Sequence, residues 1–143
     1  MFEVKQDQAS YPLFKFLDEL NPVFRHQRIN NSHTIWELMD HIRIAQEDIY
    51  QFMSNPQWKS PVWPQEYWPI KIDGIKDEKW EKTIFDFKED FNKIIQFIQS
   101  INVNITPEIP HAKGYTFLRE ILLIGEHNAH HTGQMLQLSK QLS

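Results

Sequence analysis

The stretch FLREILLIGEHNAHHTGQMLQLSKQL, residues 117–142, decides how this chain folds. Its seam positions recur in alternating steps of three and four residues, the pattern of a helix packed in a bundle. They are Phe117, Ile121, Ile124, Asn128, His131, Met135, Leu138 and Leu142. Two of these positions are polar, and one of the two is a histidine. The stretch therefore predicts a long helix that carries a polar site on its packed face.

Three earlier segments also predict helices. Two have the same regular alternation, along Ile35, Leu38, Ile42, Ala45, Ile49 and Phe52, and along Trp80, Ile84, Phe87, Phe91, Ile94, Ile98 and Ile101. The first segment is less regular, with Leu13, Leu17, Leu20 and Phe24 on one face. The fold class predicted from these four segments is all-α, a four-helix bundle.

Turn and capping residues predict where the helices begin and end. Thr34 and Glu37 have the spacing of a capping box, in which the hydroxyl and the carboxylate each bond the other residue's backbone N–H. The remaining boundaries are expected at Ser10 as N-cap with Pro12 in the first turn, at Asn21-Pro22, at Asn55-Pro56, after Asp73-Gly74, and after Lys113-Gly114.

The connection from Asn55 to Gly74 is long and rich in Trp and Pro. A connection of this length in a small domain is usually functional or packs as a cluster of its own. It also allows the second and third helices to run parallel, which a tight turn would forbid.

Composition limits the classes of function. The 143 residues carry a net charge of −4 with scattered Lys and Arg, so we expect one domain over 1–143 and no nucleic-acid partner. The absence of cysteine excludes disulfides, cysteine-bound zinc and a cysteine nucleophile. Neither a signal peptide nor a run of eighteen apolar residues is present, so we expect no membrane partner and a cytoplasmic location.

The histidines of the last helix suggest a metal site. His127 and His131 are four residues apart, which places both imidazoles on one face of a helix within reach of one ion. His41, at the edge of the second helix's seam, is the candidate third ligand. His130 points about 100° away from His131 and is expected beside the site. The alternative is that these side chains only satisfy hydrogen bonds in the core, as Asn128 and Gln134 could do for each other or for a backbone carbonyl.

Small residues form a second pattern on the last helix. Gly125, Ala129 and Gly133 are spaced by four, and glycine inside a helix costs roughly 1 kcal/mol relative to alanine. We expect another helix to approach closely here, either within the bundle or from the second subunit of a homodimer.

The lead Thr34-Ile35-Trp36-Glu37-Leu38 into His41, together with the run from His127 to Gln134, resembles the DinB-like family (DinB superfamily) of metalloenzyme bundles. The order and spacing of these motifs fit over most of the chain. The resemblance implies an up-down-down-up four-helix bundle. It also implies a divalent ion held by His41, His127 and His131.

Three neutral imidazoles would leave such an ion its positive charge and an open position, the arrangement of a catalytic metal. Zinc or nickel is expected, with iron and manganese as alternatives. The predicted function is metal-dependent thiol transfer or hydrolysis on a small molecule; any low-molecular-weight thiol would be a cosubstrate. Glu37, His130 and Gln134 are the candidates for acid or base. The alternatives are a non-catalytic, metal-stabilised bundle that serves as a binding module, and a stress-related nucleic-acid binder.

Overall fold

Four helices make up most of the computed structural model, which describes residues 12–101 and 104–143. They are α1 (Leu13–Glu19), α2 (Ile35–Ser54), α3 (Asp77–Ser100) and α4 (Phe117–Leu142). Two short 3-10 turns are η1 (Pro22–Phe24) and η2 (Gln65–Tyr67), and a small hairpin pairs β1 (Glu108–Ile109) with β2 (Ala112–Thr116). The predicted all-α class is confirmed.

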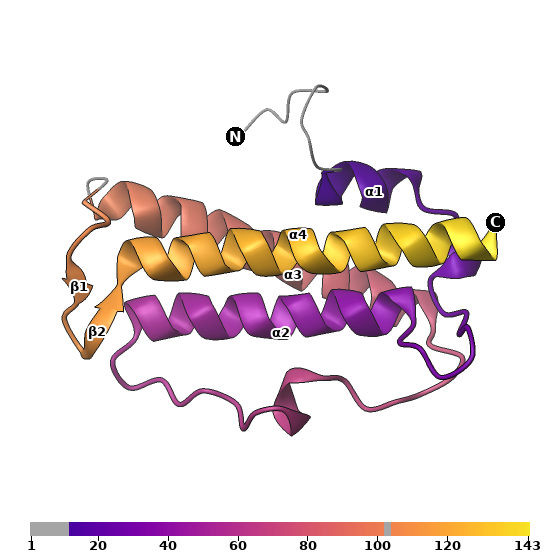
Figure 1. Cartoon of the computed structure of the whole chain (residues 1–143), viewed down its shortest axis with the longest axis horizontal. Helices are drawn as coiled ribbons and strands as arrows, with labels where there is room; N and C mark the ends of the chain where they lie inside the picture. The colour runs from indigo at the N-terminus through magenta and orange to yellow at the C-terminus, as the bar shows by residue number, and fades with distance from the viewer. Residues whose placement is uncertain (1–11, 102–103) are drawn as a thin grey trace.

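The helices are arranged up-down-down-up, as the resemblance implied (Figure 1). Helices α2 and α3 run in the same direction, and α1 and α4 run in the opposite direction. The connection between α2 and α3 passes along the outer side of α2, and η2 contacts that helix. The long connection therefore does allow two parallel neighbours, and it also covers part of α2.

The start of α2 is the predicted capping box. The Thr34 hydroxyl accepts a hydrogen bond from the Glu37 backbone N–H at 3.1 Å. The Glu37 carboxylate accepts one from the Thr34 N–H at 3.3 Å. Because both residues are buried, this cap sets the direction in which α2 enters the core.

The first helix differs from its prediction. Phe24 lies in η1 and not on α1, since the helix has already ended at Glu19, before Asn21-Pro22. The residue at the N-cap is Pro12, without a side-chain cap, and the predicted cap Ser10 lies outside the described residues. The Asn21 side chain instead accepts from the Val23 N–H at 3.1 Å and begins the 3-10 turn.

A hairpin before α4 was not predicted. The sequence indicated only a short connection, whereas Glu108 pairs with Thr116 and Ile109 pairs with Ala112. Ile109 is buried against the end of the bundle, so one apolar residue explains why this segment packs on the core.

The core consists of two apolar clusters. The first, near the N-terminus of α2, contains Phe16, Leu20, Ile35, Trp36, Leu38, Met39, Ile42, Trp80, Phe87 and Met135. The second, at the other end, contains Ile49, Met53, Ile94, Ile109 and Ile124.

A polar layer lies between the two clusters along α2 and α4. In it the Gln46 amide donates to the Phe87 carbonyl at 3.1 Å, and Asn128 donates to the Gln46 side chain at 3.3 Å. Asn128 and Gln134 therefore do not satisfy each other, contrary to one alternative. The layer places polar side chains of α2 and α4 at the middle of the bundle.

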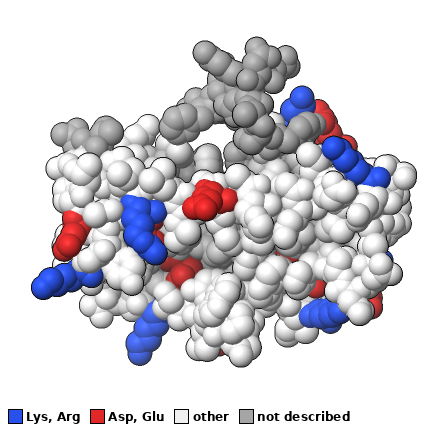
Figure 2. Space-filling model, viewed as in Figure 1, with Lys and Arg blue, Asp and Glu red and all other residues white. Residues whose placement is uncertain are grey.

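The surface of the described residues is mixed in charge. On the face drawn in Figure 2, basic and acidic side chains are scattered among uncharged ones. Among the helices that the structure describes, none is long and apolar enough to cross a membrane.

The stripe of small residues on α4 faces outward. Gly125, Ala129 and Gly133 are exposed, and a Cβ added at either glycine would meet nothing within 4 Å. The prediction that another helix of the bundle packs closely on this stripe is therefore wrong for the described residues. Contact with a second subunit stays a prediction.

The free space at Gly125 makes the stripe testable. Gly125→Ala should raise the free energy of unfolding by about 1 kcal/mol, because alanine restricts the unfolded chain and favours the helix. Urea denaturation measures the change, and light scattering gives the oligomeric state. A loss of stability together with a change from dimer to monomer would instead show that a second subunit covers the stripe.

Candidate metal centre

The structure brings the three predicted histidines together between α2 and α4. His127 and His131 lie one turn apart on α4, with ring centroids 4.5 Å apart. The His41 ring on α2 lies 4.9 Å from that of His127 and 4.7 Å from that of His131. One nitrogen from each residue can be chosen so that all three lie within 4.8 Å of one another. The three side chains therefore converge on one point.

Two of the three imidazoles are oriented by hydrogen bonds through Nδ1. The His41 Nδ1–H donates to the backbone carbonyl of Tyr67 at 2.7 Å. The His131 Nδ1 lies 2.6 Å from the side-chain oxygen of Gln134, which accepts its proton. Because Nδ1 carries the hydrogen in each case, Nε2 keeps its lone pair for a ligand bond.

Burial favours the neutral form of the three imidazoles. His41 and His131 are only 2% and 8% exposed, and burial lowers the pKa of each below its ordinary value. Burial, followed by the effect of charge on His131 and His41, lowers the pKa of His127 to about 4. Neutral imidazole is the form that binds metal.

The donor set fits a divalent ion. The Nε2 atoms of His41 and His127 are 3.1 Å apart. In a tetrahedral zinc site with Zn–N bonds of about 2.0–2.1 Å, two ligand nitrogens are about 3.3 Å apart. The residues present could therefore hold one metal ion, with three protein ligands from two helices. That they do so remains a prediction.

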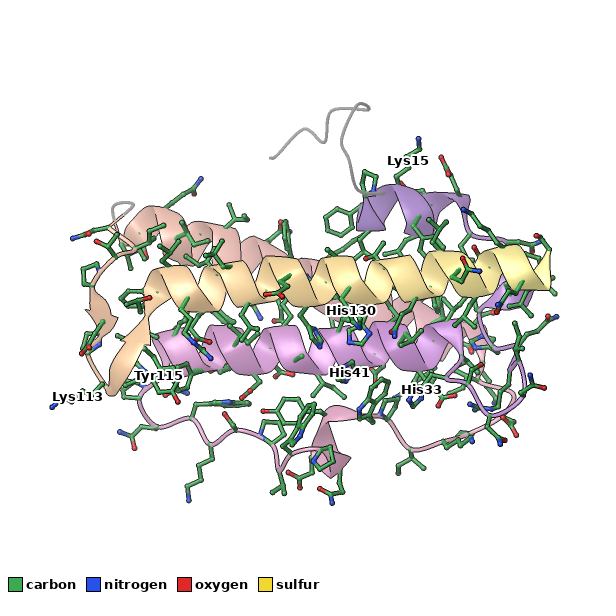
Figure 3. All side chains as sticks on the ribbon, in the orientation of Figure 1. Lys15, His33, His41, Lys113, Tyr115 and His130 are labelled. Carbon is green, nitrogen blue, oxygen red and sulfur yellow. The ribbon has the colours of Figure 1, made fainter. Side chains whose placement is uncertain are left out.

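Aromatic stacking covers the His41 ring. The Trp68 ring lies parallel to it, 3.7 Å between centroids and 3° between planes. His33 stacks on Trp68 in the same way, at 4.0 Å and 10°. Figure 3 shows His33 and His41 on the side of α2 that faces the long connection. Trp68 therefore belongs to the surroundings of the site, although nothing in the sequence links it to His41.

The candidates for acid or base are in three different environments. Glu37 is buried, and burial alone would raise its pKa. Hydrogen bonds from Arg28, at 2.5 Å, and from the Thr34 N–H outweigh this effect and hold the pKa of Glu37 below its ordinary value. Gln134 is occupied by His131. His130 is exposed, with its ring centroid 4.8 Å from that of His131, so it lies beside the three nitrogens.

Sequence reasoning missed the acceptor of His41 and the ion pair of Glu37. The acceptor is a backbone carbonyl of Tyr67, and backbone carbonyls have no sequence signature. The ion pair joins Glu37 to Arg28, which lies in the irregular segment between η1 and α2. Glu37 was recognised as a capping residue, but its buried partner could not be.

The low pKa of His127 predicts how the metal-free protein responds to acid. Its folded pKa of about 4 lies below the ordinary 6.5, so the unfolded chain takes up the proton first. The contribution of neutral His127 to the free energy of unfolding is complete above about pH 6.5 and is lost as the pH falls towards 4. His127→Asn should therefore lose less stability than the wild type between about pH 7 and about pH 5 in urea denaturation. Equal losses in the two proteins would contradict the assignment.

Comparison with known proteins identified a family for this chain. Residues 8–135 match the family model of the DinB superfamily. Comparison with curated proteins and with solved structures gave no significant match. The match spans the helices that supply all three histidines, and it agrees with the resemblance drawn from the motifs. With this match over most of its length, the chain belongs to the DinB superfamily.

Proposed function

We propose that this chain is a metal-dependent enzyme that acts on a small molecule, by transfer of a low-molecular-weight thiol or by hydrolysis. The observation that carries the proposal is the convergence of His41, His127 and His131, whose ligand nitrogens lie within 4.8 Å of one another. Three neutral protein ligands are typical of catalytic zinc, whereas structural zinc usually has four. Zinc or nickel suits the imidazole set, and iron or manganese is the alternative.

The metal, when bound, would supply an electrophilic centre that polarises the substrate. The chain's own residues would do the rest. Tyr67 and Gln134 would hold the His41 and His131 rings in orientation through their Nδ1 protons. Trp68 would shield one face of His41 from water. Since the chain has no cysteine, a thiol nucleophile would come from a cosubstrate.

Of the candidates for proton transfer, His130 is the one we retain. Glu37 is held as a carboxylate by Arg28, and Gln134 does not titrate and is occupied by His131. His130 is exposed, and its ring centroid is 4.8 Å from that of His131, so it faces solvent next to the site.

A groove next to the site supports a small-molecule substrate. It has a volume of about 340 Å³ and is lined by Ser32, His33, Leu38, Gln134, Gln137 and Leu138. Ligand pockets begin at about 300 Å³ and are mostly apolar with a few polar groups. Gln134 joins the groove to the metal centre because its side chain also contacts His131.

The proposal predicts that metal and turnover are lost together. His131→Ala should remove bound metal and lower turnover by more than about 100-fold, the upper range for a residue that merely orients a ligand. Metal content is measured on the purified protein, and turnover on panels of thiol acceptors and of esters. His111→Ala is the control, since His111 is exposed and bonds the Phe52 carbonyl at the far end of α2.

The same experiment tests the non-catalytic alternative. If the metal-loaded wild type turns over nothing on either panel, and His131→Ala only lowers the melting temperature, the ion ties α2 to α4 and the enzyme proposal is wrong.

A further inference from the structure

The long connection between α2 and α3 is attached to the bundle by Asp48. This residue lies on α2 and is 9% exposed. Its Oδ1 accepts a hydrogen bond from the indole N–H of Trp58 at 2.8 Å, and its Oδ2 accepts one from the Tyr67 hydroxyl at 2.6 Å. Both donors belong to the connection, so one carboxylate holds it at two points nine residues apart in sequence.

Tyr67 links this anchor to the metal centre. Its side chain bonds Asp48, and its backbone carbonyl accepts the Nδ1–H of His41 at 2.7 Å. Asp48 follows His41 by seven residues, which is two turns of helix, so both lie on the same side of α2. Helix α2 therefore supplies both the imidazole and the carboxylate that holds the imidazole's acceptor.

The orientation of His41 depends on where that carbonyl lies. A metal-binding histidine keeps its ring orientation and its tautomer through the partner of its other nitrogen. The next residue, Trp68, stacks on the same ring at 3.7 Å. A shift of the connection at Tyr67 would therefore remove the hydrogen-bond acceptor of His41 and also move the aromatic ring that covers it.

We propose that Asp48 is a positioning residue of the three-histidine centre, acting through the Tyr67 hydroxyl to hold the Tyr67 carbonyl on His41 Nδ1. The inference rests on the proposed metal site. It assigns to Asp48 and to the side chain of Tyr67 a role in metal affinity, although neither side chain is among the candidate ligands.

Two variants and a control test the inference. Tyr67→Phe removes only the hydroxyl that bonds Asp48, and Asp48→Ala removes the anchor itself. Thr83→Val is the control, because it breaks the buried 3.2 Å hydrogen bond from the Trp36 indole, between α2 and α3. The other hydrogen bond described for the Thr83 hydroxyl goes to the Lys79 carbonyl, which also lies outside the connection. Asp48→Asn keeps one acceptor oxygen and replaces Asp48→Ala if that protein does not fold.

Cobalt(II) serves as the probe, because its visible absorption reports both affinity and coordination. Titration of the metal-free proteins at neutral pH should show an affinity about 10- to 100-fold lower for Tyr67→Phe and for Asp48→Ala, the range found for residues that orient a metal ligand. The double variant should lose no more than Asp48→Ala alone, because both changes break one relay. Thr83→Val should lower the melting temperature and leave cobalt affinity unchanged.

The outcomes separate the two proposals. If the wild type binds no cobalt, the metal site is wrong, and the role of Asp48 fails with it. If the wild type binds cobalt and both connection variants bind it equally well, only the role of Asp48 is overturned. If Thr83→Val loses affinity as much as they do, the effect is one of general stability, and the positioning role is likewise overturned.

Discussion

The Nε2 atoms of His41 and His127 lie 3.1 Å apart between α2 and α4. His41 donates through Nδ1, so its Nε2 presents a lone pair to the neighbouring imidazole. A cation placed among the three rings would be attracted by such lone pairs, and burial favours the neutral form of the rings, which is the form that binds it. Three features of the chain determine how these rings are arranged. They are the capping box of α2, the spacing of His127 and His131, and the path of the long connection. Each of them sets the position of a ring or of the atom that orients it.

The connection is therefore as much a part of the centre as the helices are. It contributes a carbonyl, an aromatic cover and the two donors that Asp48 holds. This arrangement gives a physical reason for two of the aromatic residues of the segment. Trp58 and Tyr67 combine large apolar surfaces with a single polar group, and that group can reach a buried carboxylate. A tight turn would also fail to return along α2 before α3 begins.

The three long helices and the pairing of His127 with His131 could be predicted from the sequence, because both depend on the periodicity of a helix. Steps of three and four residues indicated α2, α3 and α4, and the Thr34-Glu37 spacing indicated where α2 begins. The spacing of His127 and His131 predicted that their rings would meet. The choice of His41 as their neighbour came from its place at a seam edge and from the family resemblance. The hairpin, the Arg28–Glu37 pair and the Tyr67 carbonyl could not be predicted, since each depends on where an irregular segment runs in space. Asp48 is an example: on the helix it is an ordinary acidic residue, and its role follows only from the residues that the connection brings to it.

The central claim is that one divalent ion binds among three particular imidazoles, and crystallography with anomalous scattering tests it most directly. Crystals of the zinc-loaded protein should give an anomalous peak above the zinc absorption edge, about 2.0–2.1 Å from one nitrogen each of His41, His127 and His131. The peak should vanish in data collected below the edge. A map with zinc bound elsewhere, or with no peak among these three rings after loading, would contradict the account.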